Sequence, residues 1–258
     1  LSGTNNMAAE FIDLYGTLSS SSGSNTINGT VNAQNGAVLN AAANATLVFN
    51  ATIPAIGSNT ITKTGPGLLR ILADPNPNGM FIIDEGTVEL QHLGTTDLNF
   101  TVNPNGTLRQ FSKDDFGDNY TLQIDGLLDF RNNDTVGGFS GSGVVTNSSS
   151  SAVAITVCNN NQSGVFSGSM RNGAGSALLS VTKTGSGFLT LSGPSTFSGG
   201  LTFSGGQLNI NYGGSSSANS ALGVGTFTIG SSLIDNTSDG DVTILPAVVQ
   251  NWNSDFTF

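Results

Sequence analysis

Acidic side chains gather in one stretch of this 258-residue chain, SKDDFGDNY at residues 112–120. Three aspartates lie in or beside it and two follow about one strand later: Asp114, Asp115, Asp118, Asp125 and Asp129. Two carboxylates at a suitable separation can hydrolyse a glycosidic bond, and carboxylate oxygens are also the ligands that Ca²⁺ prefers. The stretch matches neither an EF-hand loop nor a calcium-binding nonapeptide array. We therefore interpret it as a solvated acidic loop, with a polysaccharide-degrading site and a calcium site as the alternatives.

Histidine and cysteine, which could supply a base or a nucleophile, each occur once. His92 follows the strand-like TVELQ, and because no GxSxG elbow surrounds any serine, we interpret it as a surface residue at a corner. Cys158 lies in VAITVCNNN, where alternation directs it to the interior or to a corner, without a basic neighbour in sequence to activate it. We predict no catalytic residue, no metal site and no cofactor, and hence a protein that is not an enzyme.

The composition excludes several classes of protein. Only 9% of the residues are charged and the net charge is −10, which argues against binding nucleic acid or an anionic membrane surface. A single cysteine cannot form an internal disulfide. The chain shows neither an apolar run long enough to span a bilayer nor a leader at Leu1, so we expect a processed or excised piece of a longer protein.

One dodecapeptide occurs twice, as ITKTGPGLLRIL from Ile61 and as VTKTGSGFLTLS from Val181. The match extends without a gap over residues 61–90 and 181–210, which defines a repeat unit. A partial copy at residues 1–18 aligns with residues 191–208. This alignment sets Phe11 against Leu201.

Polar and apolar residues alternate within the repeat, as in half-buried strands, and glycine-rich corners separate the strands. A β-sandwich with Asn-Gly hairpins is one candidate. The long repeat favours the other, a parallel β-helix with coils of roughly 20–25 residues. We predict an all-β fold, a right-handed parallel β-helix (β-solenoid) of about a dozen coils that forms a single domain over residues 1–258.

The segment VTKTGSGFLTLSGPSTFSGGLTFSGGQLNI at residues 181–210 resembles the passenger-associated transport repeat, also called the autotransporter-associated β-strand repeat. This resemblance implies a right-handed parallel β-helix on a long bacterial surface protein that is secreted through the outer membrane. The first repeat departs from the pattern at residues 70–80, RILADPNPNGM, which puts its corner geometry in question.

We therefore expect a structural rod or fibre outside or on a bacterial cell. Its partners would be further copies of itself stacked end to end, or adjoining segments of the same polypeptide, since the partial repeats fit both a filament subunit and a fragment. The first alternative is an adhesin whose loops at residues 91–135 contact a surface glycan. The second is a polysaccharide-degrading β-helix that uses the carboxylates at residues 114–129.

Overall fold

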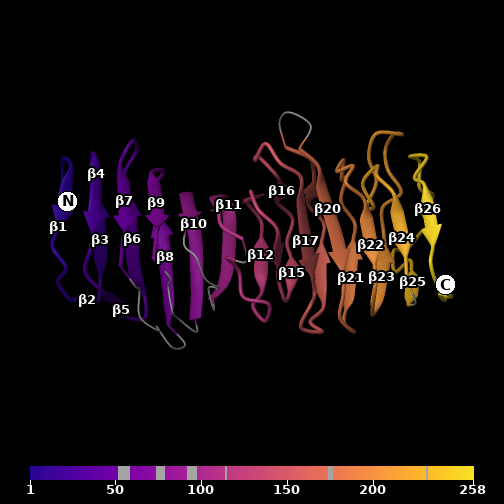
Figure 1. Ribbon diagram of the computed structural model, residues 1–258, viewed down its shortest axis with the longest axis horizontal. Helices are drawn as coiled ribbons and strands as arrows, with labels where there is room; N and C mark the ends of the chain where they lie inside the picture. The colour runs from indigo at the N-terminus through magenta and orange to yellow at the C-terminus, as the bar shows by residue number, and fades with distance from the viewer. Residues whose placement is uncertain (52–58, 74–78, 92–97, 114, 174–176, 231) are drawn as a thin grey trace.

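The computed structural model describes residues 1–51, 59–73, 79–91, 98–113, 115–173, 177–230 and 232–258. Within these residues the chain is all-β, and every ladder between its strands is parallel. The chain winds into a β-solenoid of about 11 turns, with the two termini at opposite ends of the stack (Figure 1). The predicted β-solenoid is therefore confirmed, and the hairpins of a sandwich are not found in the described ladders.

The strands stack into three columns, which we call faces 1, 2 and 3. Face 1 contains β3 (Thr17–Ser20), β6 (Ala37–Ala41), β8 (Thr60–Thr64), the first halves of β10 (Gly79–Leu90) and β11 (Leu98–Gln110), β12 (Leu122–Ile124), β15 (Phe139–Ser140), β18 (Gly164–Phe166), β21 (Phe188–Leu191), β23 (Gln207–Ile210) and β25 (Leu233–Asp235). A parallel bridge between Gly141 and Phe166 joins β15 to β18.

The other two faces follow in each turn. Face 2 contains β1 (Asn5–Met7), β4 (Ser24–Ile27), β7 (Thr46–Phe49), β9 (Leu68–Ile71), the second halves of β10 and β11, β13 (Leu127–Phe130), β16 (Val144–Thr146) and β19 (Ser169–Met170). Face 3 contains β14 (Asp134–Thr135), β17 (Val153–Val157), β20 (Leu179–Lys183), β22 (Leu201–Phe203), β24 (Phe227–Ile229) and β26 (Gln250–Trp252). In the first two coils, β2 (Ile12–Leu14) and β5 (Val31–Ala33) lie between faces 2 and 1, where the later coils have face 3.

Like side chains stack on like inside the solenoid. Inward-pointing leucine, isoleucine, valine and phenylalanine residues form one buried cluster along the stack. Ring centroids of Phe81 and Phe100 are 5.8 Å apart, and those of Phe100 and Phe116 are 5.6 Å apart. Because side chains alternate across each strand, this column of apolar residues fixes the register of the ladders.

The two copies of the repeat lie on different faces. In the first copy, β8 lies on face 1 and β9 on face 2. In the second copy, β20 lies on face 3 and β21 on face 1. Each copy advances 20 residues per turn, as shown by the pairs Ile61↔Phe81 and Val181↔Leu201. The repeat therefore encodes a glycine corner between two strands, and the solenoid uses it at two different corners.

The partial copy at residues 1–18 and its counterpart at residues 191–208 both run through the position of face 3 into face 1. The alternation of inward and outward side chains differs between the two segments. Leu201 is buried, whereas Phe11, which the sequence alignment sets against it, is 63% exposed. Leu14 points inward instead. The inward residues of the two segments are thus displaced by one position.

Candidate functional site

The aspartates of the acidic stretch do not share one surface. Asp115 is buried, and its Oδ2 accepts a hydrogen bond of 2.9 Å from the backbone N–H of Ser112. Asp118 is exposed and accepts a bond of 3.5 Å from the side chain of Asn159. Asp114 lies outside the described residues. The prediction of a solvated acidic loop therefore fits Asp118, which is exposed, but not Asp115, which is buried.

Asp125 links two successive coils at a corner. Its Oδ1 accepts bonds of 2.9 Å from the backbone N–H and 2.8 Å from the hydroxyl of Ser142, and Gln123 donates to its Oδ2 at 2.9 Å. These bonds, that from Gln123 above all, hold the pKa of the Asp125 carboxyl below its usual value. The group is therefore an ionised acceptor that ties coils together.

Asp129 belongs to a row of alternating charges along face 2. The row runs through Arg70, Glu89, Arg109 and Asp129, which the ladders place opposite one another on consecutive coils. Arg70 Nη2 lies 2.9 Å from Glu89 Oε2, Arg109 Nη1 lies 3.0 Å from Glu89 Oε1, and Arg109 Nε lies 3.0 Å from Asp129 Oδ2. We call these four residues the charge ladder.

The carboxylates of the charge ladder are nearly fully covered. The side chains of Glu89 and Asp129 are 7% and 2% exposed, whereas those of the two arginines are about one-third exposed. The hydroxyl and backbone N–H of Ser148, one coil further on, also donate to Asp129, at 2.6 and 2.8 Å. Each carboxylate is therefore paired with a cation on a neighbouring coil.

The lysine of each repeat is fully buried. Lys63 Nζ donates to the backbone carbonyls of Thr64, Gly65 and Glu85 at 2.8, 2.6 and 3.0 Å. Lys183 Nζ makes the equivalent set of bonds, to Thr184, Gly185 and Gly205 at 2.6, 3.1 and 3.0 Å. Two of the carbonyls in each set belong to the lysine's own corner and the third belongs to the next coil. We call each set of three carbonyls a lysine cradle.

Glycines make room for the cradles. Gly65 and Gly185 have φ angles of +75° and +69°, which turn the corner, and Gly86 and Gly206 of the next coil both have φ of +76°. A Cβ atom on Gly86 would lie 2.4 Å from the Gly65 carbonyl oxygen and 2.9 Å from Lys63 Nζ. Gly86, one coil beyond the first TKTGxG pattern, is therefore required by the lysine as well as by the turn.

Burial governs the ionisation of both lysines. Desolvation lowers the pKa of Lys63 from 10.5 to about 8, although the nearby Glu85 carboxylate opposes the shift. Desolvation lowers the pKa of Lys183 as well. The cradles were not predicted from the sequence, although the sequence contains a signal for them. Alternation from Ile61 places Lys63 on the inward side of the strand.

Cys158 is buried at a corner with φ of +61°. Burial raises the pKa of its thiol to about 11, so that the reactive thiolate is scarce at neutral pH, although the charge of Lys183 acts in the opposite direction. His92 lies outside the described residues, and its interpretation as a corner residue stays a prediction. In the part of the chain that the structure describes, no group of three or more His, Cys, Asp or Glu side chains is arranged to hold a metal ion.

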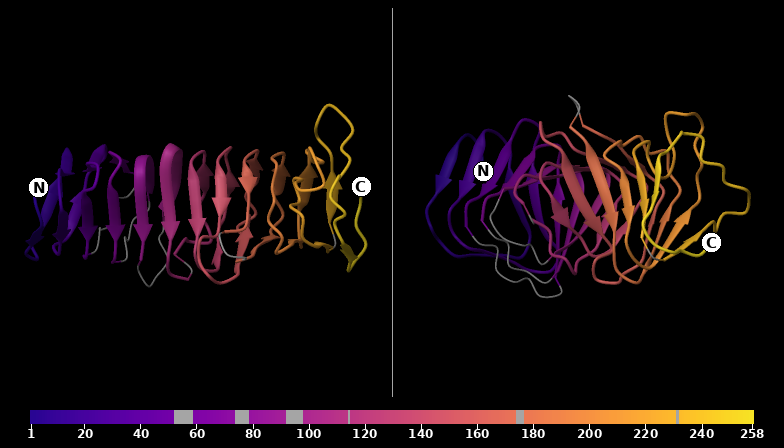
Figure 2. Two further views of the ribbon diagram at one scale, coloured as in Figure 1. Left: turned by 90° about the horizontal axis from the view of Figure 1, so that it is seen from above. Right: turned by 45° about the vertical axis from the view of Figure 1, so that its right-hand side comes forward.

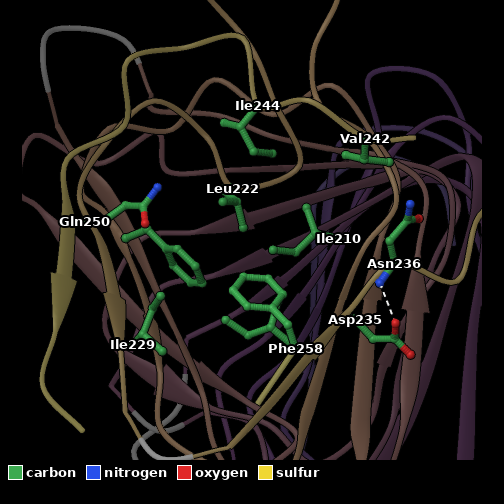
Figure 3. A pocket seen from close by; sticks show the side chains of 11 residues that line it. Ile210, Leu222, Ile229, Asp235, Asn236, Val242, Ile244, Gln250 and Phe258 are labelled. Carbon is green, nitrogen blue, oxygen red and sulfur yellow. Dashed lines mark hydrogen bonds between the residues drawn. The ribbon is translucent and has the colours of Figure 1, made fainter. Parts of the chain in front are cut away.

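A cavity opens into the core near the last coils. Its volume is about 260 Å³, and its lining is mainly apolar, with Leu222, Ile229 and Ile244 around it and Phe258 pointing into it (Figure 3). Asp235, Asn236 and Gln250 contribute the polar part of the lining. The cavity is the end of the apolar column that fills the solenoid.

Residues 181–210 match the model of the passenger-associated transport repeat. The matched segment runs from β20 to β23 and contains the whole second lysine cradle. The chain thus carries this repeat within a parallel β-solenoid, as in an autotransporter passenger, and the repeat indicates a secreted or cell-surface protein. Comparisons with curated proteins and with solved structures gave no significant match. Among the described residues, no helix is long and apolar enough to cross a membrane.

Proposed function

We propose that the chain is a structural rod segment of a bacterial surface or secreted protein, without enzymatic activity. The observation that supports this function best is the use of the ionisable side chains. Four ionisable side chains each bind a group on a neighbouring coil: Glu89, Asp129, Lys63 and Lys183. The side chains that could do chemistry therefore hold neighbouring coils together. A spacer needs such cross-links, because each coil contacts only its neighbours.

We also propose that the rod stacks end to end, either on further copies of itself or on adjoining segments of the same polypeptide. Phe11 and Tyr15 in the first coil are 63% and 76% exposed, and Trp252 and Phe258 in the last coil are 66% and 83% exposed. Figure 2 shows the first and last coils facing away from each other at the two ends. Because the ladders of the described strands are all parallel, the last coil presents strand edges that can pair with the first coil of another copy, which would build an open filament, or with an adjoining segment of the same polypeptide.

The polysaccharide-degrading alternative gains no support from the described geometry, because its described carboxylates are buried, bonded to neighbouring coils or separated. The adhesin alternative rests on loops at residues 91–135. Most of the described residues in that range form β11, β12, β13 and β14, and the adhesin function stays a prediction.

The test combines an activity assay with a mass measurement on the purified chain. Neutral and acidic polysaccharides are incubated with the protein, and new reducing ends and unsaturated products are measured. We expect no turnover, and we expect sedimentation to show species that grow with protein concentration in integer multiples of 26.2 kDa. A Trp252→Asp variant should shift this distribution toward the monomer, whereas Ser186→Asp on a lateral corner should not.

Two results would refute the proposal. Turnover that is lost in a folded Glu89→Gln or Asp129→Asn variant would make the chain an enzyme. Strict monomers at all concentrations would refute the stacking of copies end to end, which is the second part of the proposal.

A further inference from the structure

The lysines and arginines that reach solvent all lie on one side of the solenoid. Two of the seven lysine and arginine residues, Lys63 and Lys183, are buried in their cradles. The others lie on face 2 or within three residues after one of its strands: Arg70, Arg109, Lys113, Arg131 and Arg171. The net charge of the chain is −10, so accessible positive charge is confined to one side of an acidic molecule.

Two of these arginines have no carboxylate partner among the described residues. The guanidinium groups of Arg70 and Arg109 are occupied by the carboxylates of the charge ladder. Arg131 and Arg171 take part in none of the ion pairs within the described part of the chain. Arg131 is half-buried and Arg171 is exposed. Both therefore present uncompensated positive charge to solvent.

The two unpaired arginines lie at the corner that follows face 2. Arg131 comes directly after β13, and Arg171 directly after β19. The ladders, continued by one or two residues, place Arg131 one coil after Phe111 and one coil before Ser148. They place Arg171 opposite Thr146, in the coil after that of Ser148. The two arginines are therefore two coil steps apart, a separation of ~10 Å along the axis.

The surroundings of these arginines are polar and contain no acidic side chain. We call residues 111–113, 131–133, 147–152 and 171–173 the basic corner. Apart from its cations and Phe111, the basic corner contains only asparagine, serine, alanine and glycine. The described acidic residues that flank it, Asp115, Asp129 and Asp134, are buried. An anion at this corner would therefore meet hydrogen-bonding groups and positive charge without a competing exposed carboxylate among the described residues.

Arg131 is held in place before any ligand binds. Its guanidinium carbon lies 4.4 Å from the centroid of the Phe111 ring. Its backbone N–H donates to Gln110 Oε1 at 3.1 Å. Stacking on an aromatic ring fixes the plane of a guanidinium group, and a guanidinium can bind a carboxylate with two parallel hydrogen bonds. Less conformational entropy is therefore lost when Arg131 binds an anion.

We propose that the basic corner binds an acidic polysaccharide, a function that goes beyond that of a rod. Carboxylates of uronic acid units pair with Arg131 and Arg171, since a disaccharide unit of an extended chain spans their separation. The exposed side chains of Asn132 and Ser150 offer hydrogen bonds to sugar hydroxyls. Nucleic acid fits less well, because its dense phosphates require clusters of lysine and arginine that this chain lacks.

The experiment measures binding of the purified chain to polygalacturonate at low ionic strength by microscale thermophoresis. Fully methyl-esterified polygalacturonate, which has the same backbone without the charge, and single-stranded DNA serve as comparison polymers. The proteins are the native chain, Arg131→Gln, Arg171→Gln, the variant with both substitutions, and Arg70→Gln. Arg70→Gln is the matched control, because Arg70 is already bound to Glu89. Circular dichroism confirms that each variant is folded.

We expect the native chain to bind polygalacturonate but not its esterified form, and we expect added salt to weaken the binding. Each single substitution of Arg131 or Arg171 should weaken binding several-fold, and both together should abolish it. Arg70→Gln should leave it unchanged. Monomeric galacturonate should not displace the polymer at an equal concentration of carboxylate, because one exposed ion pair is weak whereas the polymer engages both arginines at once.

Absence of binding to polygalacturonate at low ionic strength would overturn the inference. Equal binding of the esterified polymer would also overturn it, because the charge would then not be recognised. Equal losses in Arg131→Gln and Arg70→Gln would count against it as well, since the effect would not belong to the unpaired arginines. Tighter binding to single-stranded DNA that is lost in the doubly substituted variant would assign the basic corner to nucleic acid instead.

Discussion

At the scale of single residues, the lysine cradle is the feature most sensitive to substitution. Lys183→Met keeps the aliphatic stem but leaves the carbonyls of Thr184, Gly185 and Gly205 without their donor. Because buried unsatisfied polar groups each cost about 1–3 kcal/mol, we expect the free energy of unfolding to fall by at least roughly 2 kcal/mol. Urea denaturation checks this value. Arg171→Met, at an exposed arginine, is the control, and an equal loss in both variants would contradict the role of the cradle.

The lowered pKa of Lys63 gives a second prediction, on the pH dependence of stability. The folded chain releases this proton near pH 8, whereas the unfolded chain keeps it until about pH 10.5. Between these values the unfolded state binds more protons, so the contribution of Lys63 to the free energy of unfolding rises with pH. We expect the native chain to show a steeper rise than Lys63→Met between pH 8 and 10. Parallel curves for the two proteins would show that the pKa is not lowered.

At the scale of strands and corners, the charge ladder predicts an order of effects. Arg109→Met removes a cation from both Glu89 and Asp129, whereas Arg70→Met leaves Glu89 with Arg109. Removing one partner of a buried ion pair costs about 3–5 kcal/mol, and partial exposure of the arginines reduces this value. We expect Arg109→Met to lose about 2–4 kcal/mol of unfolding free energy and Arg70→Met clearly less. A larger loss for Arg70→Met would contradict the described pairing.

The displaced repeat predicts that equivalent glycines are equally sensitive at different corners. Gly86 and Gly206 both have φ of +76°, and a Cβ atom on either would lie within 2.6 Å of two carbonyl oxygens. Replacement of either by alanine should destabilise the chain by similar amounts, of the order of 1–3 kcal/mol for strain of this kind. Gly16→Ala serves as the control, since nothing lies within 4 Å of the position of its Cβ. Denaturation midpoints that differ widely between the two corners would refute the equivalence.

The sequence predicts these elements to different degrees. Strands, glycine corners and the parallel β-solenoid follow from the alternation and from the repeat at residues 61–90 and 181–210. The charge ladder also has a signal, because its members are 19, 20 and 20 residues apart, which is one turn. The ladder of threonines on face 3, from Thr135 to Thr228, has no such signal, since its members are irregularly spaced. Its register depends on how many residues each corner uses, and only the fold determines that number.

The displacement of the repeat could not be foreseen for the same reason. A gapless alignment of two segments shows that they have similar local structure, but it does not show on which side of the solenoid each lies. Coils between Lys63 and Lys183 differ in length, as the offsets of 19 residues from Gly79 to Leu98 and 26 from Val153 to Leu179 show. The accumulated difference moves the second copy by one face.

At the scale of the whole molecule, outward positions on face 1 form one row along the axis of the rod. Thr17, Thr101, Ser140 and Asp235 occupy the same row in different coils. Thr101 is separated from Thr17 by four coil steps, Ser140 by six and Asp235 by ten, counted through these ladders. Distances within this row therefore report directly on the stacking of the coils.

The most direct test of the rod is a set of spin-label distances measured by double electron–electron resonance. Cysteines replace Thr17 and, in turn, Thr101, Ser140 or Asp235, while the buried Cys158 is replaced by alanine, and labelled protein is diluted with unlabelled chain. At ~4.8 Å per coil we predict separations of about 19, 29 and 48 Å, in proportion to the number of coil steps. Separations that fail to grow with the number of coil steps would contradict a single continuous solenoid.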